Sequence, residues 1–392
     1  MKKEKQFGDL ILTFTDYFEL RYNDSGSGAH SDGAFWHPIA PSGFYPLGSI
    51  GTSNYDNING KRASICIKAA PGCEDAIKRP IGYDLIWADH GSGAHMDGSC
   101  WRPKAPTGYV SLGDVFVRGY NIPSLNDIMC VRKDLTDRGR IGNEIWADHG
   151  SGAKSDFTSF QIQANSETLD SEKGVFAPNT FVGNNKYSKP TDAPELNCLY
   201  LQFPVEVSSV PEVPKLSGHF MPPEYAGKTI DRIISVPFTA INDDAYSLSW
   251  KVNNSPFYQV ERQISYKREL YDYNMTSVDQ VVSRSITTGI SESTSSSFYV
   301  HTGIKVSYSS GVACLGGEVS AEISTELGWE TTDSTEEFRE DTVNKQLVTP
   351  PQKSAAIWAL SYSLQIVRGN GTYLANQLSF DVSSFVHDEF PD

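Results

Sequence analysis

Aspartate and histidine residues recur at fixed places in a short glycine-rich loop that the chain contains three times. The loop reads Asp-Ser-Gly-Ser-Gly-Ala-His over residues 24–30, Asp-His-Gly-Ser-Gly-Ala-His over 89–95, and Asp-His-Gly-Ser-Gly-Ala-Lys over 148–154. Carboxylates accept hydrogen bonds from hydroxyl groups, and an indole ring can stack on the apolar face of a sugar. The pattern therefore indicates three related receptor, sugar or cation sites. The candidate binding residues are Asp24, His30, Asp32, Trp87, Asp89, His95, Asp97, Trp146, Asp148 and Asp156.

A purely structural role explains the same loops equally well. Gly-Ser-Gly favours a turn with positive φ, and the aspartate then caps the backbone amides of that turn. On this interpretation Trp36, Trp101 and Phe160, which occupy equivalent positions, fill the core between the repeats. The aspartates and histidines lack the convergent spacing of zinc or calcium ligands, so we expect no metal and no cofactor.

The loops belong to a longer repeat that predicts the architecture of the first half of the chain. Residues 24–50 and 89–115 are identical at 15 of 27 positions without a gap, and a third copy diverges after its loop. Strand-like apolar pieces recur and few segments show helical periodicity, so the chain is expected to be all-β. Three related strand-rich units close most easily as a pseudo-threefold, three-sided prism or a trefoil over residues 1–203. A proline-rich linker over 204–232 then leads to an elongated β domain over 233–392.

Two alternating segments between residues 298 and 330 carry a second functional hypothesis. Even positions from Phe298 to Tyr308 are mostly apolar, as are odd positions from Val319 to Trp329, and the other parity is polar. Successive strand residues point to opposite faces, so the pattern predicts an amphipathic hairpin with a glycine-flanked apolar tip. Each arm is long enough to cross a bilayer as a tilted strand. A hairpin in a water-soluble sandwich gives the same alternation, but the apolar tip, the serine-rich flank and the glutamate row favour a membrane role.

One hairpin alone cannot cross lipid, because its outer edges would leave backbone groups unpaired. The hypothesis therefore requires a homo-oligomeric ring that closes the hairpins into a barrel with a cation-favouring lumen. The residues expected to face lipid are Phe298, Val300, Ile304, Val306, Tyr308, Val312, Leu315, Val319, Ala321, Ile323, Leu327 and Trp329. The residues expected to line the lumen are Lys305, Glu318, Glu322, Glu326 and Glu330.

Composition excludes several other classes of protein. The net charge of −15 argues against nucleic acid as a partner, because phosphate binding needs a basic surface. No run of 18 apolar residues and no recognisable signal peptide is present, so we expect release without a classical leader. The six cysteines form no CxxC pair, which favours buried structural thiols over disulfides or metal ligands. No nucleophile elbow, P-loop, HExxH or dinucleotide fingerprint occurs, so an enzyme is not expected.

The repeat motif Asp-x-Gly-Ser-Gly-Ala-His-x-Asp-Gly, followed by Trp-x-Pro, Pro-x-Gly-Tyr and Leu-Gly-Asp-Val, resembles the Vps62 family over residues 8–200. That resemblance implies a β-prism, a fold that many prism proteins use for carbohydrate recognition. Residues 236–243, residues 250–258 and the hairpin end at 318–329 are similar to those of aerolysin-type β-pore-forming toxins. This second resemblance covers about residues 230–390. It implies an elongated all-β protein that binds a target cell, assembles into rings and releases a hairpin into the membrane.

We therefore expect a secreted or released pore-forming toxin, cytolytic or insecticidal, that acts at the plasma membrane of a target cell. Its expected partners are a surface receptor or glycan, the membrane, and further copies of the same chain. A non-lytic lectin-like protein is the main alternative. An intracellular trafficking adaptor is a further alternative, which the family name alone suggests.

Overall fold

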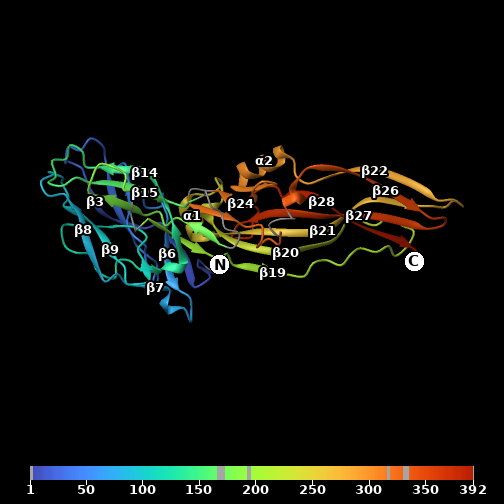
Figure 1. Cartoon of the computed structure of the whole chain (residues 1–392), viewed down its shortest axis with the longest axis horizontal. Helices are drawn as coiled ribbons and strands as arrows, with labels where there is room; N and C mark the ends of the chain where they lie inside the picture. The colour runs from blue at the N-terminus through green and yellow to red at the C-terminus, as the bar shows by residue number, and fades with distance from the viewer. Residues whose placement is uncertain (1–2, 166–172, 192–195, 316–317, 330–334, 392) are drawn as a thin grey trace.

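A computed structural model of the whole chain describes residues 3–165, 173–191, 196–315, 318–329 and 335–391. The molecule is long and narrow, with the repeats at one end and the longest strands at the other (Figure 1). Within the described residues the only α-helices are α1 (Leu248–Asn254) and α2 (Glu292–Thr302). Short 3₁₀ turns are η1 (Glu74–Ala76), η2 (Lys133–Leu135), η3 (Phe238–Ala240) and η4 (Thr335–Phe338). The expected all-β class is confirmed.

Each repeat contributes one three-stranded antiparallel sheet to the free end of the molecule. In the first repeat these strands are β3 (Phe18–Asn23), β4 (Ala34–Pro38) and β5 (Ile50–Thr52). In the second they are β8 (Gly82–Ala88), β9 (Gly98–Lys104) and β11 (Val115–Arg118), and in the third β14 (Arg140–Ala147), β15 (Thr158–Gln163) and β17 (Phe181–Asn184). The predicted pseudo-threefold arrangement is therefore present.

Each repeat also contributes a second small sheet, nearer the middle of the molecule. These sheets contain β1 (Lys5–Phe7), β2 (Leu10–Thr15) and β6 (Ser64–Ala69); β7 (Ile77–Lys78), β12 (Cys130–Arg132) and β10 (Tyr109–Val110); and β13 (Thr136–Arg138), β18 (Asn197–Leu201) and β16 (Gly174–Phe176). β10 and β16 occupy equivalent places, because each pairs antiparallel with the central strand of its sheet and follows the glycine-rich loop of its repeat, whereas β7 and β13 precede that loop.

The core on the pseudo-threefold axis is aromatic. Phe35 and Phe116 stack with their ring centroids 3.8 Å apart, and Trp87 and Trp146 meet edge to face at 5.6 Å. The interpretation that Trp36, Trp101 and Phe160 form this core is wrong, since they lie in three separate clusters. Side chains alternate across a strand, so the residue next to an axial one points to the other face of its sheet.

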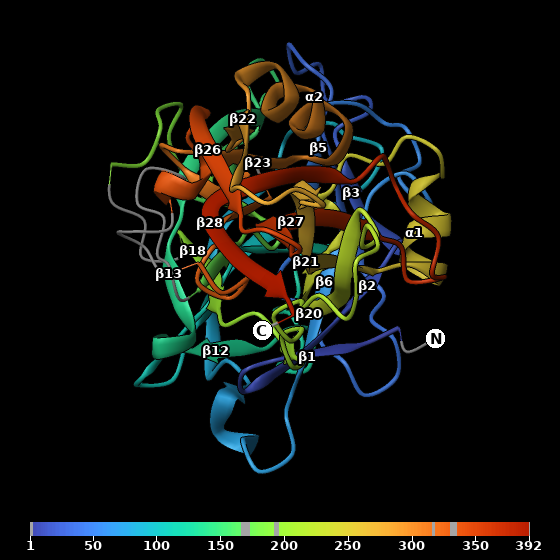
Figure 2. The same ribbon diagram turned by 90° about the vertical axis from the view of Figure 1, so that its right-hand side faces the viewer.

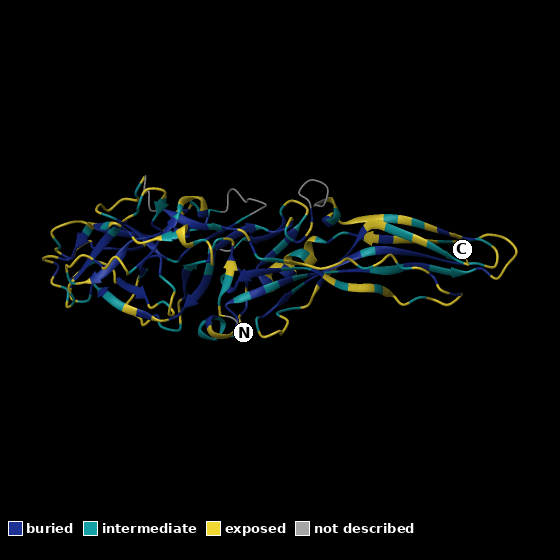
Figure 3. Ribbon diagram, turned by 90° about the horizontal axis from the view of Figure 1, so that it is seen from below, coloured by how far each residue is buried: buried dark blue, intermediate teal, exposed yellow. Residues whose placement is uncertain are grey.

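The second half is built on a long five-stranded antiparallel sheet in the order β19-β20-β21-β27-β28. These strands are β19 (Val205–Val207), β20 (Tyr225–Pro237), β21 (Phe257–Tyr273), β27 (Ser354–Val367) and β28 (Leu378–Phe390). A separate two-stranded ribbon, β22 (Gln280–Thr288) with β26 (Asp341–Thr349), lies along its far end. This ribbon is among the most exposed regular structure of the elongated half (Figure 3).

The stretch predicted as a linker over 204–232 is only partly a linker. It contains β19 and the first residues of β20, which belong to the long sheet. Between them the chain follows the sheet, and Leu216 packs on Trp358 while its backbone N–H donates to Asp388 Oδ2 at 2.6 Å. One continuous hydrophobic core joins the two halves, running from Phe7 of β1 to Phe380 of β28.

The predicted hairpin over 298–330 does not exist in this state. Residues 292–302 form α2 on the outside of the molecule (Figure 2), followed by β23 (Ile304–Ser307), β24 (Gly311–Leu315) and β25 (Val319–Glu322). Ser291 caps the helix by accepting from Thr294 N–H, and Gly303 ends it with φ of 78°. Serine at the N-cap and glycine after the last turn are strong helix boundaries, and they outweigh the strand-like alternation.

Candidate functional site: the repeat loops and the 289–340 segment

The aspartates that begin the three loops are structural caps. Asp24 is buried, and its carboxylate accepts from Gly33 N–H at 2.8 Å and from Ser27 Oγ at 3.1 Å. Asp89 accepts equivalently from Gly98 N–H, and Asp148 from Phe157 N–H. These carboxylates are occupied by hydrogen bonds within the turn. The prediction that they bind a ligand directly is therefore wrong for this state, and the capping interpretation describes them.

A tyrosine joins each buried aspartate to the exposed one eight residues later in the chain. Tyr55 donates its hydroxyl to Asp24 Oδ1 at 2.8 Å and also hydrogen-bonds Asp32. Tyr120 and Tyr187 lie beside the equivalent aspartates of the other repeats, whose carboxylates act on their hydroxyls, and the three rings are 37–39% exposed. Burial and then the carboxylates raise the pKa of each tyrosine, so the hydroxyls stay protonated donors.

Sequence reasoning missed these tyrosines, although a signal was present. Tyr55 and Tyr120 both follow their loop aspartate by 31 positions. The exposed carboxylates they contact are Asp32, Asp97 and Asp156, which were predicted as binding residues and do lie on the surface.

The loops of neighbouring repeats interlock through backbone hydrogen bonds. His30 N–H donates to His149 O at 2.7 Å, His95 N–H to Ser25 O at 2.8 Å, and Lys154 N–H to His90 O at 3.0 Å. The His95 ring covers Gly26 so closely that a β-carbon there would lie 2.7 Å from it. The predicted residues His30 and His95 are therefore exposed side chains at junctions between repeats.

The three junctions carry different side chains. One combines His30 with His149, whose ring stacks on Tyr187 at 3.5 Å. Another combines Lys154 with His90, whose ring lies tilted against Tyr120 with the centroids 3.9 Å apart. The third has His95 alone, because Ser25 replaces the second histidine. Each junction thus presents an exposed carboxylate, a tyrosine face and a cationic or imidazole group, a set suited to hydroxyl-rich or charged ligands.

Trp87 and Trp146 cannot stack on a ligand in this structure. Both are 1% exposed, and their indole N–H groups donate to Asp148 Oδ2 and to Ser31 O, each at 2.9 Å. The prediction that these rings form sugar platforms is wrong, because they occupy the axial core instead.

Metal and thiol chemistry find no site in the described part of the chain. No three His, Cys, Asp or Glu side chains gather there as a metal centre would require. All six cysteines are free, and burial raises the pKa of the Cys130, Cys198 and Cys314 thiols to about 12. Among the described residues, no helix has the length and hydropathy to span a bilayer.

The residues predicted to face lipid are mostly buried in the shared core. Val300 and Tyr308 are the exposed exceptions, at 66% and 43%, and Leu315 is half-buried. The fully buried members are Phe298, Ile304, Val306, Val312, Val319, Ala321, Ile323, Leu327 and Trp329. The predicted lumen residues Lys305, Glu318, Glu322 and Glu326 are half-buried, and Glu330 lies outside the described residues.

Trp329 is held against the long sheet by Arg262. The Arg262 guanidinium lies 4.8 Å from the Trp329 ring centroid and donates to Gly328 O at 3.2 Å. Its other nitrogens bind the buried Asp231. The indole N–H of Trp329 donates to Glu337 Oε2 at 3.2 Å. The end of the segment is therefore attached by a buried charge rather than by apolar contact alone.

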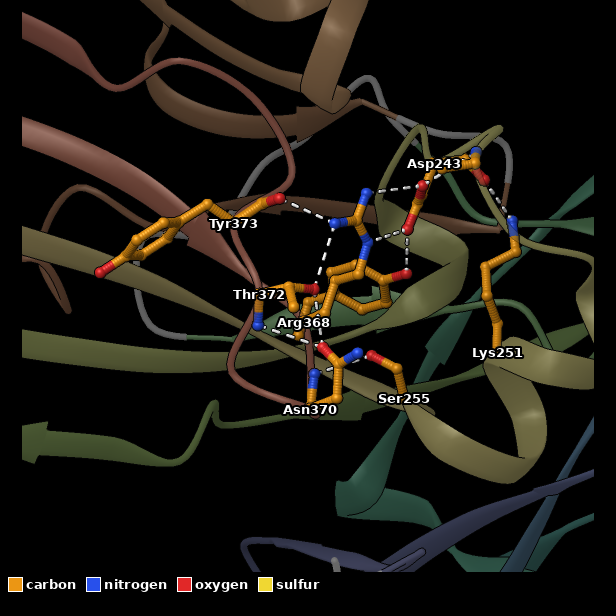
Figure 4. Close-up of polar contacts among 10 residues, drawn as sticks. Asp243, Lys251, Ser255, Arg368, Asn370, Thr372 and Tyr373 are labelled. Atoms are coloured by element: carbon orange, nitrogen blue, oxygen red, sulfur yellow. Dashed lines mark hydrogen bonds and ion pairs between the residues drawn. The ribbon is translucent and has the colours of Figure 1, made fainter.

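A second buried ion pair anchors the loop before α1 to the turn after β27 (Figure 4). Arg368 donates to both carboxylate oxygens of Asp243, at 2.7 and 3.1 Å, and Tyr258 Oη donates to Oδ2 at 2.6 Å. Burial alone would raise the pKa of Asp243, but these donors outweigh it and hold that pKa below its ordinary value. Lys251 and Tyr373 complete a network in which Asp243 and Arg368 are fully partnered, so we interpret it as structural.

The fold and these contacts define an all-β protein with two parts, a pseudo-threefold repeat half and an elongated half that share one core. The family profile described as Vacuolar protein sorting-associated protein 62 matches residues 6–222. The match covers more than half of the chain, so the chain belongs to the Vps62 family.

Solved structures give weaker likenesses. GNIP1Aa from Chromobacterium piscinae aligns at 29% identity and a TM-score of 0.41, over 48% of this chain and 37% of its own length. This chain therefore spans little more than a third of GNIP1Aa. Cry35Ab1 aligns over 99% of this chain and 91% of its own, at 12% identity and a TM-score of 0.41. A search of curated proteins finds no match.

Proposed function

We propose that this protein is a β-pore-forming toxin, secreted or released by its producer. It binds a cell surface through the loops of the repeat half, assembles into a ring, and inserts residues 289–340 as part of a β-hairpin. The observation that carries the proposal is the register of the β22–β26 ribbon, from which this segment departs and to which it returns.

Pairing in the ribbon runs without a slip from Gln280↔Thr349 to Thr288↔Asp341. Continued at the same register, it would set Val306 opposite Ile323 and Tyr308 opposite Ala321, with the turn at residues 314–315. Directly opposed residues share a face of an antiparallel pair. The register therefore places the apolar residues of both arms on one side of the hairpin and the glutamates on the other. Two alternating arms paired at random would agree in this way only half the time.

The ribbon already has the same division of faces. Its inward residues include Ile286 and Leu347, which are buried at 3% and 1%, and these have the parity that continues into the apolar face of the segment. The polar face continues into Lys305, Glu318 and Glu322. A ring of such hairpins would satisfy every backbone group and give an acidic lumen that favours cations.

The exposed side chain of Val300 offers a direct test, because changing it does not disturb the core. Val300 and His301 are neighbours in the last turn of α2, both exposed, and they have opposite parities. Val300→Asp would put a charge toward lipid, whereas His301→Asp would put it in the lumen. An acidic residue facing lipid costs less than roughly 2–4 kcal/mol per copy, but the cost recurs in every copy of a ring.

We expect Val300→Asp to lower dye release from vesicles at least tenfold, and His301→Asp to leave release within about threefold of wild type. Both variants should keep the wild-type melting temperature. Equal loss in the two variants would contradict the parity assignment. Tight cell binding by wild type with sealed vesicles at all doses would favour the second candidate, a non-lytic lectin-like protein, which the exposed loop junctions support.

A further inference from the structure

One strand of the 289–340 segment completes a sheet of the repeat half. β25 pairs antiparallel with β16, Val175 opposite Ser320 and Phe176 opposite Val319. The resulting six-stranded sheet, in the order β13-β18-β16-β25-β24-β23, crosses between the two halves. In the second repeat the equivalent strand β10 is the edge of its sheet. Among the described residues, only the third repeat therefore has a partner strand from the segment.

Polar contacts reinforce this junction at one point. Ala177 N–H donates to Glu318 O at 2.7 Å, and Asn179 Nδ2 donates to Glu318 Oε1 at 3.0 Å and to Ala63 O at 3.1 Å. Asn179 has φ of 61°, a conformation that asparagine tolerates better than most residues. It joins the first repeat, the third repeat and the segment.

The junction borders a small polar cavity of about 190 Å³, lined by residues of the first and third repeats and by Glu318. Apart from Glu318 itself, Arg62 is the one charged side chain among its lining residues. The Glu318 carboxylate is thus held by a single neutral donor and a nearby positive charge rather than by a close ion pair. Such an attachment can be broken at lower cost than the buried Arg262–Asp231 pair.

The junction is also connected to the loop end of the molecule. Asn179 lies two residues before β17, and β17 leads directly to Tyr187 at the loop junction of the third repeat. β17 pairs with β15, which follows the Asp148 loop. A displacement of the third loop would therefore be passed along the paired strands β15 and β17 to Asn179, and from Asn179 to Glu318.

We propose that the β16–β25 junction is a latch that keeps the 289–340 segment in its water-soluble position until the repeat loops engage a cell surface. This inference rests on the proposed function and specifies its control. Strand addition supplies backbone hydrogen bonds that the segment must give up before it can re-pair along the ribbon register. The latch lies in the third repeat because only there does the segment reach the edge of a repeat sheet.

Asn179→Asp tests the latch by weakening it. It keeps the size and the tolerance of positive φ, removes the amide donor and places a carboxylate beside Glu318. We expect hydrogen exchange of the 319–322 amides to accelerate at least tenfold, with exchange in β21 unchanged. The double variant Asn179→Asp with Glu318→Gln restores a donor across the same contact and should recover most of the wild-type protection.

A disulfide between β16 and β25 tests the latch by locking it. Val175→Cys with Ser320→Cys changes two small opposed side chains, and each single variant under the same oxidation controls for pairing with the nearby Cys198. The oxidised double variant should release vesicle dye at least tenfold more slowly than wild type, bind cells normally, and recover on reduction. Wild-type release by the oxidised protein, or unchanged exchange in Asn179→Asp, would overturn the latch. If the wild-type protein itself releases no dye, the proposed pore-forming function is wrong. The hydrogen-exchange result for Asn179→Asp would still show whether the β16–β25 junction holds the segment.

Discussion

Trp329→Phe should free the 289–340 segment without unfolding the long sheet. The substitution removes the indole donor to Glu337 and weakens the contact with Arg262, whose guanidinium lies 4.8 Å from the ring. A hydrogen bond to a charged group contributes about 1.5–3 kcal/mol, and a desolvated cation–π contact about 0.5–2 kcal/mol. Part of each remains with phenylalanine or with water, so a loss of roughly 2–4 kcal/mol is expected from the segment alone.

Because roughly 1.4 kcal/mol corresponds to a factor of ten in an equilibrium constant, this loss raises opening of the segment by roughly 30- to 1000-fold. Hydrogen exchange resolves such local opening from global unfolding. Amides of 304–329 should exchange faster by that factor, while those of 257–273 in β21 keep their wild-type rates.

Trp358→Phe is the matched control. Trp358 is 0% exposed in β27, and its indole nitrogen has no hydrogen-bond partner among the described residues. This variant should lower the melting temperature without selective exchange in 304–329. Equal acceleration of segment and sheet in Trp329→Phe would refute the reasoning, because it would show that the two regions open only as one unit.

Two other measurements follow from the same contacts. Tyr187→Phe removes the hydroxyl beside Asp148 and Asp156, and it should weaken cell binding several-fold while leaving dye release at saturating dose unchanged. Loss of release without loss of binding would count against the loop end as receptor site. Burial raises the pKa of Glu318, Glu322 and Glu337 in the folded monomer, so the contribution of these carboxyls to its stability is greatest at low pH and is lost as pH rises through these raised values. Glu318 and Glu322 would lose that burial in a hydrated lumen, so release should be slower at pH 5 than at pH 8, and acid-triggered release would contradict this.

The repeat half was predictable because its signals are local and occur in multiple copies. Glycine spacing in the loop fixes the turn, and Gly26 and Gly28 indeed have φ of 90° and 78°. The wrong choice of core aromatics was avoidable. Tyr22, Trp87 and Trp146 each precede their loop aspartate by two positions, so threefold symmetry alone places them as one ring.

The tyrosines of the loop junctions were harder to find, because each approaches its aspartate from a distant part of the repeat. Tyr187 also breaks the spacing of the other two, since the third copy diverges after its loop. Interlocking between repeats is likewise a tertiary feature. No pattern within one loop indicates that His30 donates to the backbone of His149.

The segment after β22 is the one place where sequence pattern and folded structure disagree over a long stretch, and the disagreement itself bears on function. Alternation from Phe298 to Tyr308 crosses a helix and a glycine stop, neither of which needs period two, before it reaches the short strand β23, which does. The helix places Val300 in solvent at 66% exposure, where an apolar side chain adds nothing to this fold. An isolated amphipathic hairpin would expose its whole apolar face to water, so a monomer that inserts such a hairpin would have to hold those residues in another arrangement until a membrane covers them. Under the proposed function the pattern describes a second structure of the same sequence, and the unbroken register of the β22–β26 ribbon is the part of it that the described fold already contains.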